Sequence, residues 1–120
     1  MKDPYVSLKV AKLLKEKGFD WETDYYYRKH GSDVEQLTLY ELNYEREKFI
    51  EAPTQQMACD WLEETHGLFI KIGRSMDINS NYYYSYNVLD KDNTSQIKSI
   101  RPSKKDAIES ALEYALINLI

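Results

Sequence analysis

Apolar residues recur at helical spacing in three stretches of the chain, Ser7–Gly18, Thr54–His66 and Ser103–Leu119. Each stretch opens on a serine or threonine, whose hydroxyl can accept a hydrogen bond from the free N–H groups of a first helical turn. The first two stretches close on a glycine followed by a hydrophobic residue, a pattern typical of a left-handed helix stop. The sequence therefore predicts three amphipathic helices.

The apolar stripes show which side of each helix should face the core. In the central helix the stripe is Met57, Ala58, Trp61, Leu62 and Thr65. In the last helix, which is expected to lie across a sheet, the stripe is Ala107, Ile108, Ala111, Leu112, Ala115, Leu116 and Leu119. Because these residues repeat every three or four positions, each set should be buried on one side.

Alternation of polar and apolar residues predicts strands between the helices. Residues 21–30 and 35–42 should pair as a hairpin around a turn at 30–33, and residues 68–72 and 82–89 should form a second hairpin. Residues 94–100 are expected to form a short fifth strand. Residues 43–48 are expected to be a solvated loop, with Phe49 and Ile50 clipping onto the central helix as a hydrophobic staple.

Together these elements predict an α+β fold in the order α-β-β-α-β-β-(β)-α, built as one domain over residues 1–120. We expect one antiparallel sheet of four to five strands with the three helices on one face. The three capping residues are 47 and 49 residues apart, and each has an alanine four residues later. This spacing fits an internal αββ duplication, with coincidence as the alternative.

The composition narrows the classes of function. A net charge of −4 disfavours a general nucleic-acid binder, because binding phosphates requires a basic face. The sequence lacks a run of about 18 apolar residues and the basic-then-apolar layout of a signal peptide. We therefore expect a cytoplasmic protein with no membrane segment. A single cysteine excludes an intrachain disulfide scaffold.

Residues that could carry chemistry are few and scattered. His30 and His66 have no neighbours at metal or catalytic spacing, and His66 is expected to complement a helix dipole. Cys59 adjoins an acidic residue and should be a structural thiol. The stretch 90–93 resembles the start of a calcium loop, but Ser95 and Arg101 occupy the glycine and glutamate positions. The sequence thus predicts a non-enzymatic protein with no catalytic, metal or cofactor residues.

Tyrosine is unusually frequent, with eleven in 120 residues, and clusters in the predicted strands. Successive strand residues point to opposite faces, so some of these rings should lie on the open side of the sheet. Such rings favour a homo-oligomer interface, a docking surface for another protein or a stacking platform for single-stranded nucleic acid. They also fit a sheet surface on which the rings pack flat. The candidate interaction surface is Tyr26, Arg28, Lys71, Arg74 and Tyr83.

Four segments resemble those of small uncharacterised proteins encoded by gut bacteria and their phage-like mobile elements. They are residues 13–21, Tyr25-Tyr26-Tyr27, Ala52-Pro53-Thr54 and Trp61-Leu62. The resemblance spans most of the chain and implies an α+β fold, an association with mobile elements and no assigned activity.

The leading hypothesis from the sequence is a protein-interaction module that forms a homodimer through an open sheet face or an edge strand. The alternative is an accessory protein that binds single-stranded nucleic acid through Tyr26, Tyr83 and nearby basic side chains. An enzyme of unknown class is the third hypothesis.

Overall fold

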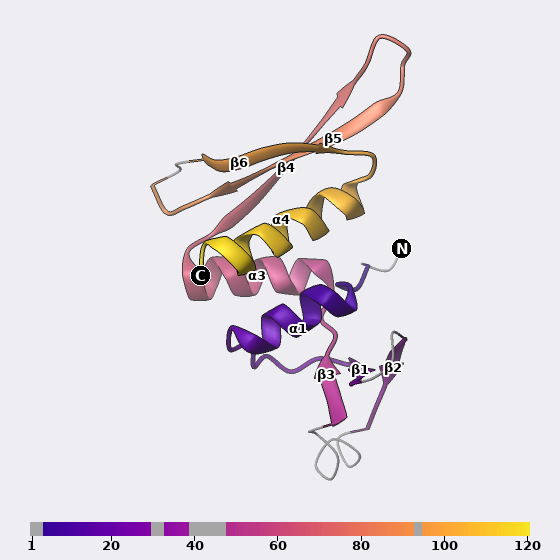
Figure 1. Cartoon of the computed structure of the whole chain (residues 1–120), viewed down its shortest axis with the longest axis vertical. Helices are drawn as coiled ribbons and strands as arrows, with labels where there is room; N and C mark the ends of the chain where they lie inside the picture. The colour runs from indigo at the N-terminus through magenta and orange to yellow at the C-terminus, as the bar shows by residue number, and fades with distance from the viewer. Residues whose placement is uncertain (1–3, 30–32, 39–47, 93–94) are drawn as a thin grey trace. The chain divides into compact units, whose positions relative to one another are not determined.

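The computed structural model describes residues 4–29, 33–38, 48–92 and 95–120, with the backbone alone for 95–99 (Figure 1). In these residues the chain forms three helices and two three-stranded antiparallel sheets, which confirms the α+β class. The chain divides into two compact units, residues 1–58 and 59–120. The boundary falls within helix α3 (Gln55–His66), and each unit is described separately below.

The first unit combines one helix with a small sheet. Helix α1 (Leu8–Glu16) is followed by β1 (Tyr25–Arg28), β2 (Val34–Gln36) and β3 (Phe49–Glu51). The strands lie in the order β2-β1-β3, so the first strand of the unit is the central one. Helix α1 packs against β3.

Helix α1 starts and stops where local chemistry requires. The Ser7 hydroxyl accepts a hydrogen bond from the Val10 N–H at 3.2 Å and caps the first turn. Gly18 adopts a left-handed φ of +94°, and the Phe19 N–H then donates to the Leu14 carbonyl at 2.9 Å. This glycine stop turns Phe19 back into the core, where it is buried.

Backbone hydrogen bonds join the segment before α1 to the segment before α3. The Val6 N–H donates to the Pro53 carbonyl at 3.0 Å, and the Gln55 N–H donates to the Pro4 carbonyl at 2.8 Å. From β1, the buried Tyr27 hydroxyl donates to the Val6 carbonyl at 2.6 Å. The N-terminal end of the described chain is therefore fixed to this unit by both backbone and side-chain bonds.

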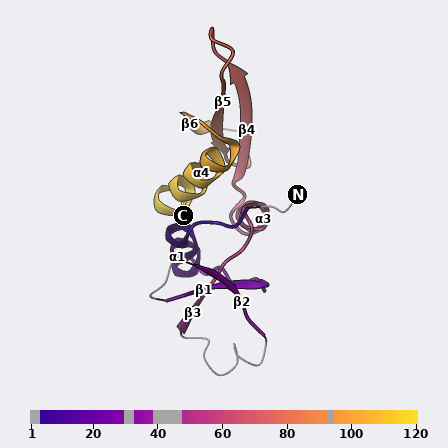
Figure 2. The same ribbon diagram turned by 90° about the vertical axis from the view of Figure 1, so that its right-hand side faces the viewer.

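The second unit is a larger sheet with one helix across it. It contains β4 (Phe69–Met76), β5 (Tyr82–Leu89), β6 (Ser95–Arg101) and α4 (Lys104–Asn118), with the strands in the order β4-β5-β6. Helix α4 contacts all three strands, as expected from its apolar stripe (Figure 1). The β4–β5 hairpin extends beyond the end of α4 (Figure 2).

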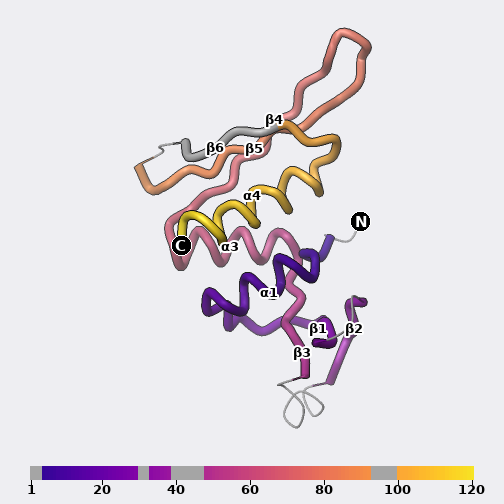
Figure 3. The backbone as a smooth tube through the Cα atoms, in the orientation of Figure 1, coloured from indigo at the N-terminus to yellow at the C-terminus, as the bar shows by residue number. Residues whose placement is uncertain are grey.

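A glycine corner connects α3 to β4, and the tube in Figure 3 shows this reversal. Gly67 has a left-handed φ of +67°, and its N–H donates to the Glu63 carbonyl at 3.0 Å. The next residue, Leu68, is buried, and Ile70 and Ile72 follow on the same face of the strand. The predicted helix stop is confirmed, and the predicted buried face is covered in part, because Ile70 and Ile72 are half-buried.

The buried stripes of α3 and α4 largely match the prediction. Helix α4 is capped by the Ser103 hydroxyl, which accepts from the Asp106 N–H at 3.1 Å. Its buried residues are Ala107, Ala111, Leu112, Ala115 and Leu116. In α3, Trp61 and Leu62 are buried as expected. The expected stripe member Thr65, near the end of the helix, is exposed, whereas the polar Gln55 at its start is buried.

The sheet arrangement differs from the prediction. The strands form two sheets of three instead of one sheet of four to five, and each sheet lies in its own unit. Phe49 and Ile50, expected to form a helix staple, belong to β3, where Ile50 pairs with Tyr27. The fifth predicted strand is present as β6.

Helices α1 and α3 are each followed by an antiparallel hairpin, which is the local order that an αββ duplication would require. The third strand of each sheet pairs with a different member of the hairpin. In the first sheet β3 pairs with β1, the first hairpin strand, whereas in the second sheet β6 pairs with β5, the second hairpin strand. The two sheets therefore have different strand orders. His30, most of the expected loop at 43–48, and residues 93–94 lie outside the described residues.

Candidate functional site

The five residues of the predicted interaction surface lie in two different sheets. Tyr26 and Arg28 belong to β1 in the first unit, and Lys71, Arg74 and Tyr83 belong to β4 and β5 in the second. The structure thus assigns the candidate residues to two separate surfaces.

Tyr26 does not provide an exposed ring. It is 6% exposed and forms a small cluster with Phe49 and the partly buried Leu37. The prediction that Tyr26 is displayed is therefore wrong, because the rings on this sheet face pack against one another. Arg28 is exposed, and its Nε lies 2.9 Å from Glu35 Oε2, so its charge is locally compensated.

Strand register determines the two faces of the second sheet, since residues directly opposite in antiparallel strands project to the same side. Ile72 pairs with Tyr86, and Arg74 pairs with Tyr84, which pairs in turn with Arg101. The Arg101 Nε donates to the Ser110 hydroxyl of α4 at 2.9 Å, which identifies this side as the helix-covered face. Arg74 therefore lies on the helix side of the sheet.

The opposite side of this sheet is an open face. Lys71 and Tyr83 lie on it, together with Phe69, Leu89 and Ile100. Two of its apolar side chains are strongly exposed, Phe69 at 45% and Ile100 at 63%. Here "open face" denotes these five residues. Of the two candidate residues on this face, Lys71 is exposed and Tyr83 is half-buried, and the exposure of Phe69 and Ile100 was not predicted.

The tip of the β4–β5 hairpin is a well-ordered turn. The Asp77 carboxylate accepts hydrogen bonds from the N–H groups of Asn79 and Asn81, both at 2.9 Å. This turn presents Ile78 to solvent with 98% of its surface exposed. In the two strands that flank this turn, the Arg74 guanidinium of β4 lies 4.3 Å from the centre of the exposed Tyr82 ring of β5. Arg74 is thus engaged by a cation–π contact.

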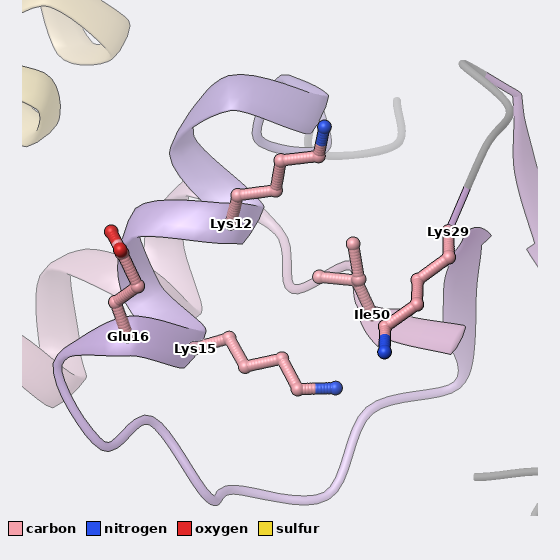
Figure 4. Close-up of a pocket in the computed structure, with 5 residues that line it drawn as sticks. All are labelled: Lys12, Lys15, Glu16, Lys29 and Ile50. Carbon is pink, nitrogen blue, oxygen red and sulfur yellow. The ribbon is translucent and has the colours of Figure 1, made fainter. Parts of the chain in front are cut away.

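A shallow hollow of about 530 Å³ in the first unit is lined by Lys12, Lys15, Glu16, Lys29 and Ile50. Figure 4 shows the Lys15 and Lys29 side chains extending toward each other, whereas the Lys12 ammonium group points away from them. The Lys15 Nζ donates to the Phe49 carbonyl at 3.1 Å. The hollow therefore has a positive rim in which one of the ammonium groups already serves to fix β3 to α1.

Cys59 on α3 is half-buried and has the properties of a structural thiol. Burial, with smaller contributions from the charges of Asp60 and Glu109, raises the pKa of Cys59 to about 12. Because the thiolate is the reactive form, the folded protein should hold this cysteine unreactive at ordinary pH.

We therefore expect iodoacetamide to alkylate Cys59 at pH 9 at least about a hundredfold more slowly in the folded protein than in urea. The neutral thiol also contributes stability that is complete below the unfolded pKa and decreases as the pH rises toward 12. Mass spectrometry of quenched samples measures the alkylation rate. Equal rates in the folded and unfolded protein would contradict this assignment.

Within residues 4–29, 33–38, 48–92 and 95–120, no three His, Cys, Asp or Glu side chains converge as metal ligands would. In the same part of the chain, no helix combines the length and the apolar character needed to cross a bilayer. His66 is exposed at the end of α3, with its ring 4.9 Å from that of Trp61.

Comparison of the chain with protein-family models, with curated proteins and with solved structures finds no match.

Proposed function

We propose that the protein is a non-enzymatic interaction module that forms a homodimer through its β4–β5–β6 sheet. The observation that supports this most is the open face, where Phe69 is 45% exposed and Ile100 is 63% exposed on the same side of one sheet. Burying such apolar surface against a second protein is favourable, and exposed apolar patches on ordered sheets are typical of interaction sites.

The charges near this sheet favour protein over nucleic acid. Lys71 and Lys98 both pair with Asn87 of β5, and Arg74 lies on the opposite side, so at most two cations occupy open-side positions of the described strands. Tyr26 and Arg28 belong to the other sheet. A binding site for a phosphate backbone requires several cations along one groove. The nucleic-acid alternative is supported by the cation–π pair of Arg74 and Tyr82 at the hairpin, since an exposed aromatic ring beside a cation can stack with a base.

Light scattering coupled to size exclusion tests the proposal. At micromolar concentration we expect the mass of two chains, compared with 14.2 kDa for one. A strictly monomeric protein across this range would contradict the homodimer.

Fluorescence anisotropy with a labelled single-stranded oligonucleotide tests the alternative. The titration is carried out at low salt, where electrostatic binding is strongest. We expect no saturable binding. Saturable binding that Arg74→Ala and Tyr82→Ala both weaken would instead favour a nucleic-acid function.

A further inference from the structure

The edge strand β4 is the longest regular strand edge in the described chain. It pairs with β5 over all eight residues, from Phe69 to Met76, without a break in register. The opposite edge strand, β6, pairs with β5 through a register shift between Asn87 and Leu89. The edge strands β2 and β3 of the first sheet have three residues each. Short or irregular edges resist pairing with another chain, and β4 is neither.

Apolar side chains on both sides of β4 are incompletely covered. On the helix side, Ile70 and Ile72 are half-buried, although Val88 and Tyr86, their partners on β5, are buried. On the open side, Phe69 is exposed. Helix α4 thus covers the central strand more completely than the edge strand. A strand added beside β4 would bury apolar surface on both faces and would use its free backbone groups.

The sequence of β4 is self-complementary in the antiparallel register centred on Ile72, which overlaps residues 69–75 of both strands. With Ile72 opposite the partner's Ile72, Lys71 lies opposite the partner's Gly73 and Phe69 opposite the partner's Ser75. This pairing is apolar at the twofold axis and keeps like charges apart. A register centred on Lys71 would instead place two ammonium groups directly opposite each other, which is destabilising.

The geometry points to a second copy of this chain as the occupant of the β4 edge, joined antiparallel about a twofold axis at Ile72. This inference rests on the proposed homodimer and specifies its contact. The interface is isologous, so it closes at two copies, and the two sheets become one sheet of six strands. Both open faces then lie on the same side and form one extended surface, with Phe69 of each copy beside the joint.

Disulfide formation locates the contact. In a Cys59→Ser background, Ile72→Cys should oxidise rapidly to a covalent dimer, because this position faces its own copy across the axis. The matched control is Ile78→Cys, a residue 98% exposed at the tip of the same hairpin, outside both β4 and the open face. We expect this control to remain monomeric on a non-reducing gel at the same protein concentration.

A charge at the axis provides the second test. Ile72→Lys should weaken the dimer at least tenfold, because two lysines would meet at the twofold axis. Ile78→Lys, at the hairpin tip outside the open face, should leave the dimer intact. Circular dichroism checks that both variants fold. If Ile72→Lys does not fold, the disulfide experiment alone determines whether the β4 edge forms the contact.

The outcomes separate the inference from the function on which it rests. A wild-type monomer in light scattering would overturn the proposed homodimer itself. A wild-type dimer that neither forms the residue 72 disulfide nor responds to a folded Ile72→Lys would overturn the edge contact, while the homodimer would stand. A residue 78 disulfide forming as fast as the residue 72 disulfide would likewise overturn the β4 assignment.

Discussion

Leu112→Ala is expected to lower the free energy of unfolding by about 2–5 kcal/mol, a loss typical of a fully buried leucine. Leu112 is 0% exposed and lies on the stripe of α4 that covers the β4–β5–β6 sheet. Because Leu112 is fully buried, its truncation to alanine removes apolar volume from the core and leaves a cavity there. Urea denaturation followed by circular dichroism measures the loss.

Ile117→Ala is the matched control on the same helix. Ile117 is 50% exposed, so its truncation removes a similar aliphatic group without opening a buried cavity. We expect a change of less than about 1 kcal/mol, as for most surface substitutions. If the two variants lost equal stability, the helix would not pack on the sheet through the stripe described above.

The helices could be predicted from the sequence because their limits depend on local chemistry. Ser7 and Ser103 cap their helices through contacts three residues away, and Gly18 and Gly67 end theirs with left-handed backbone. Each of these features involves residues within one helical turn of one another. Periodicity then identified the buried side of α4, including Leu112.

The partition into two sheets could not be predicted in the same way, because strand pairing is a non-local choice. Phe49 and Ile50 are two apolar residues before a helix, and a hydrophobic staple explains them as well as a strand does. What makes them a strand is pairing with β1, more than twenty residues earlier. No local signal in the sequence specifies that partner.

The candidate site was predicted in part for a related reason. Alternation along β4 and β5 correctly separated Lys71 and Tyr83 from the residues beneath α4. It could not show that Tyr26 packs against Phe49, because those residues belong to different strands. The exposure of Ile100 was also missed, since an apolar residue in a strand is ordinarily predicted to be buried.

Tyr27→Ala is expected to destabilise the protein by about 3–5 kcal/mol, the range for removing a buried aromatic ring. Tyr27 is buried, and its hydroxyl donates to the Val6 carbonyl at 2.6 Å. Tyr27→Phe retains the ring and removes the hydroxyl alone, leaving that carbonyl without this donor. We expect Tyr27→Phe to cost about 1–3 kcal/mol, and urea denaturation separates the two contributions.

Tyr82→Ala is the control that distinguishes a structural tyrosine from a displayed one. Tyr82 is exposed on the β4–β5 hairpin, and its described contact is the cation–π pair with Arg74. Its removal should cost no more than about 1 kcal/mol, the strength of such a pair at an exposed site. Were Tyr82→Ala as destabilising as Tyr27→Ala, the hairpin would be part of the core. With the expected difference, the tyrosines of β1 stabilise the first unit, and the displayed aromatic surface available for association belongs to the second sheet.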